Sequence, residues 1–166
     1  MRILKPAVLL AFLALGGCHT PTVAFDPKAA AFVNEKGSTR IDAHAFFRAG
    51  NGRVVYAAGE YVHLVPVTPY SEQRMAMLYG GRKLARASLS IFDDPDPEYK
   101  KYVRSVKAES NGRASFENVA PGDYFVASTV TVFTPDMIFP EGGAIYERVT
   151  ITGKEKEPVK VIVSGK

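Results

Sequence analysis

The feature that most constrains this fold is a repeated alternation of apolar and polar residues in short stretches that begin at Thr39. In residues 41–48 every second residue is apolar, and residues 159–163 repeat the pattern. Successive side chains of a strand point to opposite faces, so a period of two predicts strands with one buried face. The run Gly50-Asn51-Gly52 and similar turn residues separate the stretches, which favours sharp reversals between strands.

Turn-forming residues are abundant, because the 166 residues include 14 glycines and 11 prolines. With 46% hydrophobic and 23% charged residues, the chain has the composition of a single globular domain. This composition excludes collagen-like, low-complexity and coiled-coil chains. We count about seven strands at the spacing typical of a β-sandwich. The sequence therefore predicts an all-β, immunoglobulin-like sandwich.

Two short segments interrupt the β pattern and are predicted to be helical insertions. Ser71 is suited to cap a first helix that ends at Gly80, and Asp96 followed by Pro97 is a typical start of a second helix. Before the first helix, residues 61–67 are apolar on both faces. This predicts a strand in the middle of a sheet that is covered on both sides.

Two dipeptides predict tight connections between the later strands. The Asn-Gly pair at 111–112 favours a two-residue hairpin between residues 103–108 and 114–116. The Pro-Gly pair at 121–122 favours a type II turn, in which the glycine takes a positive φ.

The N-terminus predicts export of the protein. Arg2 and Lys5 precede an uncharged apolar run that is too short to span a bilayer, so residues 1–17 are predicted to be a signal peptide. The run ends in LGGC, and the last of these residues is Cys18. This segment resembles a bacterial lipobox, and the resemblance implies that Cys18 is acylated and anchors the protein in a membrane. A plain secreted protein with Cys18 near the cleavage site is the alternative.

The cysteine count agrees with lipidation. Cys18 is the only cysteine, so a disulfide within the chain is excluded, and acylation would remove a reactive thiol from an oxidising compartment. His19 follows it, whereas the resemblance to lipoproteins implies that aspartate there would mark retention in the inner membrane. We therefore expect a lipid-anchored protein of the bacterial cell envelope, localised to the outer membrane.

The charge balance bears on the partner. Removal of Arg2 and Lys5 with the signal peptide reduces the 21 basic residues to 19, against 17 acidic residues. So small a positive excess argues against nucleic acid as a partner.

The exported chain divides into two parts. Residues 18–38 are expected to form the acylated N-terminus and a flexible tether, because they are mostly small or polar and show no sustained period. Within them, residues 27–33 favour a turn or two of helix. The domain itself is expected to span residues 39–166.

The stretch SNGRASFENVAPGDYFVAS, residues 110–128, combines the two turn dipeptides with Phe116 and Val119, which are predicted core residues. It resembles the core motif of carboxypeptidase regulatory-like domains, the small transthyretin-like β-sandwiches of many bacterial envelope proteins. Residues 41–70 are similar to the start of a subset of these proteins, although Phe133 stands where that subset has tryptophan. The resemblance implies a non-catalytic binding or structural module with no cofactor.

Two alternative functions stay open for such a domain. A carbohydrate-binding module would use exposed tyrosines, because aromatic rings can stack on sugars, and its partner would be a glycan in place of an envelope protein. The tyrosines considered are Tyr56, Tyr61, Tyr70, Tyr79, Tyr99 and Tyr102. A small hydrolase of transthyretin-like fold is the other, but the chain ends VSGK and lacks the Tyr-Arg-Gly-Ser type of ending of the hydroxyisourate hydrolases.

Other residues that could carry chemistry have simpler interpretations. His44 and His63 could approach each other if their strands pair, but two imidazoles do not complete a zinc site, so both are interpreted as surface residues. The acidic run 93–98 lacks the pattern of a calcium loop and is interpreted as a solvated loop with a helix cap. No serine lies in a Gly-x-Ser-x-Gly elbow; those considered are Ser88, Ser90 and Ser115. No catalytic residue or metal ligand is therefore expected.

Overall fold

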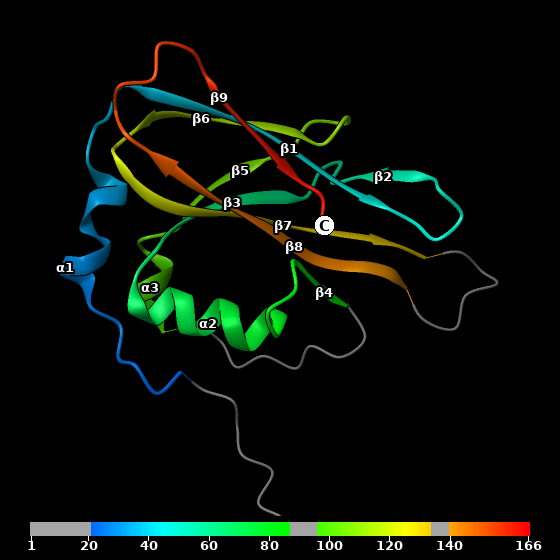
Figure 1. Cartoon of the computed structure of the whole chain (residues 1–166), viewed down its shortest axis with the longest axis horizontal. Coiled ribbons are helices and arrows are strands. Elements are labelled where there is room, and N and C mark those ends of the chain that lie inside the picture. Colours follow the sequence, from blue (N-terminus) through cyan, green and yellow to red (C-terminus); the bar gives the residue numbers. More distant parts are fainter. Residues whose placement is uncertain (1–20, 87–95, 134–139) are drawn as a thin grey trace, which may run out of the picture.

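The computed structural model describes residues 21–86, 96–133 and 140–166, which form two stacked β-sheets with helices of residues 69–79 and 97–100 on one outer side and a short helical segment, residues 27–34, at one end (Figure 1). The all-β sandwich is confirmed, with nine described strands instead of about seven. The strands are β1 (Thr39–Arg48), β2 (Val54–Tyr56), β3 (Tyr61–Pro66), β4 (Leu84–Arg86), β5 (Arg104–Lys107), β6 (Arg113–Val119), β7 (Gly122–Val132), β8 (Glu141–Ile151) and β9 (Val159–Val163). The helices are α1 (Pro27–Ala30), the 3-10 helix η1 (Ala31–Asn34), α2 (Pro69–Tyr79) and α3 (Pro97–Lys100).

β1 is the central strand of the four-stranded sheet. It pairs antiparallel with β6 and β2 and parallel with β9. The register places Ile41 beside Phe116 and Val159, so the apolar positions of three strands share one face. The strands predicted from the alternation in residues 41–48 and 159–163 are confirmed.

The five-stranded sheet has the order β4-β8-β7-β3-β5. β7 and β8 form a long antiparallel ladder, and β3 lies between β7 and β5. Val62 and Leu64 of β3 are buried in the core between the sheets, while Val65 is buried on the other side, in the apolar cluster under the helices. The prediction of a central strand with both faces covered is therefore confirmed.

The main core lies between the two sheets. Phe116 and Val119 are buried in it, as predicted. Tyr124 is also buried, and its hydroxyl donates a hydrogen bond to the carbonyl oxygen of Ala120 at 2.9 Å. Burial raises the pKa of Tyr124 to about 12. The internal hydrogen bond satisfies the phenol at the start of β7, where water does not reach it.

Both predicted helical insertions are confirmed, and they lie on the outward side of the five-stranded sheet (Figure 1). The N-cap of α2 is Thr68 and not Ser71. Thr68 and Ser71 bond each other's backbone N–H groups in a capping box, with Pro69 as the first helical residue. Proline is favoured there because the first N–H of a helix has no partner within the helix. α2 ends at Gly80 in the left-handed conformation, as predicted.

The predicted hairpin around the Asn-Gly pair is wrong, although the turn itself is present. The backbone N–H of Glu109 donates to the carbonyl of Arg113, and Gly112 has a φ of 75°. However, β5 pairs with β3 and β6 pairs with β1, so this turn carries the chain from one sheet to the other. A turn dipeptide reverses the chain locally, whereas burial of apolar side chains selects the strands that pair.

The expected flexible tether is also wrong for residues 25–37, which pack on the sandwich. α1 and η1 confirm the predicted turn or two of helix. Val33 in η1 is 1% exposed and belongs to the main core. The ring of Phe25 lies 5.5 Å from that of Tyr70. These apolar residues are too widely spaced to show a period in the sequence, yet each finds a site on the domain.

Gly122 is explained by the same packed segment. The φ angle of Gly122 is 152°, whereas the glycine of a type II turn has a φ of about 80°. A Cβ atom on Gly122 would lie 2.4 Å from the ring of Phe32. The glycine is therefore needed mainly because the η1 ring rests against the backbone at the start of β7.

Some predictions fall on residues outside the described ranges and stay predictions. They are the signal peptide 1–17, Cys18, Ser88, Ser90 and the first half of the acidic run, residues 93–95. None of the helices in the described part of the chain has the length and apolar character needed to cross a membrane.

Candidate functional site

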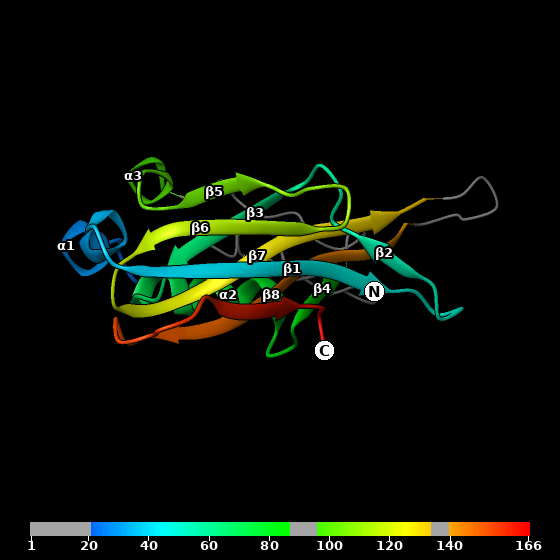
Figure 2. The same ribbon diagram turned by 90° about the horizontal axis from the view of Figure 1, so that it is seen from above.

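The outward side of the four-stranded sheet is the first candidate, and we call it the open face. Figure 2 looks onto it, and no described helix or strand lies over it. Because Ala43 and Ala45 of β1 face the core, the residues between them face outward. The outward side chains of this sheet are Arg40, Asp42, His44, Phe46, Tyr56, Arg113, Ser115, Glu117, Lys160 and Ile162.

Three rings gather at one end of the open face. The rings of His44 and Tyr56 are stacked, with centroids 5.5 Å apart and planes inclined by 15°. Phe46 meets Tyr56 edge-on at 6.4 Å, and Nε2 of His44 lies 3.0 Å from the carbonyl oxygen of Asn111. These contacts hold the rings in place, while Tyr56 is 44% exposed. The face therefore presents a fixed, accessible aromatic surface.

Charged side chains occupy the other end of the open face. Asp42 accepts hydrogen bonds from Arg40 Nε and from the Ser115 hydroxyl, each at 2.7 Å. The bond from Arg40, followed by that from Ser115, lowers the pKa of Asp42. Arg40 also pairs with Glu117 at 3.0 Å. A single guanidinium thus contacts both Asp42 and Glu117 on this face.

A shallow hollow lies between these two ends. Its volume is about 240 Å³, and its lining includes Asp42, His44, Arg113, Lys160 and Ile162. Arg113 and Lys160 stand on the strands on either side of β1. The hollow therefore offers hydrogen-bond donors on two sides and an exposed apolar side chain, Ile162, at its edge.

His44 and His63 do not come together, because β1 and β3 belong to different sheets. They lie on the two opposite outer sides of the sandwich, so the pairing that a shared metal site would require does not form. In the ranges that the structure describes, no group of three or more His, Cys, Asp and Glu side chains is placed to hold a metal ion.

The second candidate is a groove between α2, α3 and the outward side of the five-stranded sheet, which we call the helix groove. Its volume is about 390 Å³. It is lined by His63, Val65, Arg74, Met75, Leu78, Tyr79, Tyr99, Lys100, Val103, Ser105 and Ala127. The groove is thus mostly apolar, with a few polar groups, which is the usual character of a small-molecule site.

Sequence reasoning missed one polar contact in the helix groove. Nδ1 of His63 lies 2.8 Å from the hydroxyl oxygen of Ser105, and partial burial lowers the pKa of His63. The two residues are 42 positions apart and meet only through the pairing of β3 with β5. No motif marks them. A hydroxyl beside a neutral imidazole resembles a nucleophile with its base, but no Asp or Glu lines the described groove to orient the imidazole.

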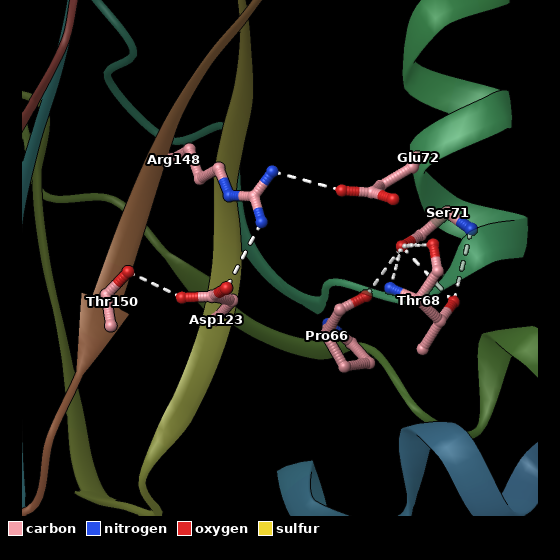
Figure 3. Close-up of polar contacts among 7 residues, drawn as sticks. All are labelled: Pro66, Thr68, Ser71, Glu72, Asp123, Arg148 and Thr150. Atoms are coloured by element: carbon pink, nitrogen blue, oxygen red, sulfur yellow. Dashed lines mark hydrogen bonds and ion pairs between the residues drawn. The ribbon is translucent and has the colours of Figure 1, made fainter.

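A polar cluster fixes α2 to the sheet beside this groove (Figure 3). Arg148 of β8 donates to Glu72 of α2 at 3.0 Å and to Asp123 of β7 at 3.1 Å. Thr150 donates to the other oxygen of Asp123, and these hydrogen bonds lower the pKa of that carboxyl. The guanidinium also stacks over the Phe125 ring, 5.8 Å from its centroid. All these groups are used within the protein, so the cluster is structural.

The six tyrosines differ in how far they are exposed to solvent. Tyr70, Tyr79 and Tyr99 are buried under the helices, and burial raises the pKa of Tyr99 to about 12. Tyr102 is half-buried. Tyr56 and Tyr61 are the exposed ones, at 44% and 55%, and they lie on opposite sheets.

A scan of known protein families finds no match to the chain, and a search of curated proteins finds none either. Among solved structures, the chain is similar to a crystal structure of a proposed carbohydrate-binding protein from Pseudomonas aeruginosa. The TM-score is 0.67, the sequence identity is 23%, and the match covers 84% of this chain and 97% of the other. The similarity extends over nearly the whole of that protein and shows that the two chains share a fold.

Proposed function

We propose that this protein is a lipid-anchored lipoprotein of the bacterial outer membrane whose sandwich is a non-catalytic carbohydrate-binding module. The observation that carries the proposal is the open face, where a fixed and accessible ring adjoins a hollow with charged side chains. The solved structure described as a proposed carbohydrate-binding protein supports it, because the two chains share a fold.

The chemistry of a sugar fits the two ends of the open face. A pyranose ring has a face of C–H groups, which packs on an aromatic ring, and a rim of hydroxyls, which needs hydrogen-bond partners. Tyr56 supplies the ring, while Arg113, Lys160 and Asp42 supply charged partners beside it. Hydrogen bonds to charged groups are stronger than neutral ones. The uncovered sheet face also leaves room for a chain of sugars.

The test compares the two exposed tyrosines. Residues 19–166, which contain every described element, are applied to a glycan array and to immobilised peptidoglycan. The affinity for the retained glycan is then measured for the wild type, Tyr56→Ala and Tyr61→Ala. Stacking of a ligand ring on an aromatic side chain is worth about 1–3 kcal/mol where it has been measured with nucleobases, which corresponds to roughly 5- to 150-fold in affinity. We expect that loss for Tyr56→Ala and unchanged affinity for Tyr61→Ala.

Several results would contradict the proposal. Retention of no glycan by the wild type, or equal losses in both tyrosine variants, would remove the open face as a sugar site. Capture of an envelope protein on the open face, without glycan, would favour a structural or assembly role instead. Turnover of the bound glycan would contradict the non-catalytic assignment.

Lipid anchoring is tested separately on the full chain. Cells that express it are labelled with radioactive fatty acid, and their inner and outer membranes are separated on a density gradient. We expect label on the wild type in the outer membrane and none on Cys18→Ala. Equal labelling of both proteins would contradict the role of Cys18, and label in the inner membrane would contradict the localisation.

A further inference from the structure

The shallow hollow of the open face has two cations and one carboxylate in its described lining. Arg113 of β6 lies beside His44 of β1, and Lys160 of β9 lies beside Asp42 of β1. Neighbouring strands are about 4.8 Å apart, so the two cations stand on opposite sides of β1 while both line the same hollow. A ligand that enters the hollow therefore meets a positive charge on either side.

The carboxylate of the hollow is already engaged within the protein. Asp42 accepts hydrogen bonds from Nε of Arg40 and from the hydroxyl of Ser115, each at 2.7 Å. These two hydrogen bonds are the main reason why the pKa of Asp42 is lowered, and the charge of Lys160 makes a smaller contribution. The negative charge of Asp42 is thus balanced chiefly by Arg40, which lies outside the lining of the hollow.

The two cations of the hollow are not used in this way. Among the described residues, neither Arg113 nor Lys160 forms an ion pair. Both residues are exposed on the surface. The hollow therefore keeps a positive excess, and the charges on its two sides attract an anionic group at short range.

The aromatic ring of the open face adjoins this positive hollow. His44 lines the hollow, and its ring is stacked on the ring of Tyr56 with centroids 5.5 Å apart. Arg113 directly follows Gly112, where a Cβ atom would lie 3.3 Å from the Cβ atom of Tyr56. The ring and the cations thus lie close enough to contact the same sugar or two successive sugars of one chain.

We propose that the glycan bound by the open face is acidic, with an anionic substituent between Arg113 and Lys160 and a sugar ring packed on Tyr56. This inference rests on the proposed function and adds the chemical class of the sugar. The guanidinium fork of Arg113 matches two oxygens of a carboxylate or a phosphate, and the ammonium of Lys160 adds a point charge. Uronic acids and phosphorylated sugars share this chemistry.

The first test varies the charge of the sugar and keeps its rings. Residues 19–166, as in the glycan test, are titrated by calorimetry with trigalacturonate and its trimethyl ester, and with galactotriose with and without one phosphate. At low salt, we expect at least one charged sugar to bind roughly tenfold more tightly than its neutral counterpart. The larger gain identifies the acidic substituent as a carboxylate or a phosphate.

Salt provides a second readout of the same contact. Raising the ionic strength from about 0.01 M to about 0.15 M shortens the Debye length from about 30 Å to about 8 Å. The affinity for the charged sugar should therefore fall, whereas the affinity for its neutral counterpart should stay the same. A charged sugar whose affinity does not respond to salt would contradict an ionic contact in this exposed hollow.

The second test varies the protein. Arg113→Gln and Lys160→Gln should each weaken binding of the charged sugar about threefold, the size expected of an exposed ion pair, and should affect the neutral counterpart less. Arg82→Gln and Lys156→Gln remove the same charges at exposed positions outside the lining of the hollow. These two controls should leave both affinities unchanged. All four variants should melt like the wild type, because surface substitutions change stability little.

The outcomes separate this inference from the proposed function. Equal affinities for charged and neutral sugars, with both still weakened by Tyr56→Ala, would overturn the acidic class and leave the sugar-binding function in place. Equal losses in the hollow variants and in the two controls would reduce the effect to the net charge of the protein, and would also overturn the inference. Retention of no glycan at all would contradict the proposed function itself.

Discussion

The two outer sides of this sandwich are built from the same kind of strand but meet different surroundings. On the four-stranded sheet, outward positions carry charged and aromatic residues such as Asp42 and His44, and no described segment covers them. On the five-stranded sheet, outward positions carry Val65, Phe125 and Ala127, and α2 and α3 lie over them. The helices thus give the molecule a second apolar cluster that the open face lacks.

This difference shows how a single sandwich can offer two unlike surfaces. An uncovered sheet face stays in water, so polar outward residues alternate along each strand with apolar residues that point into the core. The outward side chains can then contact a polar ligand. A covered face must be apolar to hold the helix, and imperfect closure between helix and sheet leaves a groove. Tyr56 on the open face is consequently exposed, whereas Tyr99 and Tyr79 beside the groove are buried.

The largest expected difference between the two sides comes from two phenylalanines. Phe125 is 5% exposed under α2, whereas Phe46 is half-buried on the open face. Phe125→Ala should lower the free energy of unfolding by about 3–5 kcal/mol, because it removes a packed ring and leaves a cavity. Phe46→Ala should cost only about 1 kcal/mol, the size of its ring contacts. Urea unfolding of both variants measures this, and equal losses would show that the open face is packed as tightly as the covered one.

The cap of α2 is the next test, because it acts only on the covered side. Thr68 is buried and accepts a hydrogen bond from the backbone of Ser71. Thr68→Ala should lower the free energy of unfolding by about 1 kcal/mol through loss of this cap. Thr68→Ser keeps the hydroxyl and should stay close to the wild type in thermal melts. A Thr68→Ala melt identical to that of the wild type would mean that packing alone holds α2 in place.

A smaller change in the free energy of unfolding is expected when acid protonates Asp42 and Asp123, which lie on the two outer sides of the sandwich. Hydrogen bonds lower the folded-state pKa of both Asp42 and Asp123. A carboxyl with a lowered pKa contributes stability above its unfolded value of about 3.9, and loses it as the pH falls through the folded value. Stability should therefore fall as the pH drops below about 4.

Replacing each aspartate in turn shows how much each outer side of the sandwich contributes to this loss of stability in acid. Asp123→Asn and Asp42→Asn should each flatten the fall in the free energy of unfolding between pH 5 and pH 3, measured by urea unfolding. Asp123→Asn should also weaken the contact of Arg148 with the sheet, because the neutral amide loses the ion pair with the guanidinium. If the free energy of unfolding of both variants fell with pH as steeply as that of the wild type, the lowered pKa values of Asp42 and Asp123 would be contradicted.

The smallest effect on stability is expected at His44. It lies on the open face with its ring on Tyr56, and a surface substitution of this kind usually changes stability by less than about 0.5 kcal/mol. His44→Ala should therefore melt like the wild type but have a lower affinity for the sugar that Tyr56 contacts. A loss well above that size would show that His44 is a packing residue and not part of a ligand surface.

Local pattern was enough to predict most of the described strands, though not β4, together with the two insertions and the core residues Phe116 and Val119, because each depends on neighbours in the sequence. The capping error has a simple source. Ser71 and Thr68 are both good caps, and only the Pro69 position after Thr68 distinguishes them. The contact of His63 with Ser105 could not be predicted, since it requires the pairing of β3 with β5.

The sequence by itself determined which segments are extended and which face of each strand is buried, because the alternation of side chains is a local property of the backbone. It also determined that Asp42 and His44 of β1 point away from the core and that residues 61–67 are apolar on both faces. The tertiary structure decided which strands pair, that residues 25–37 join the domain, and where the rings and cations meet. These depend on contacts between distant residues, and many arrangements of the same strands bury the same apolar faces.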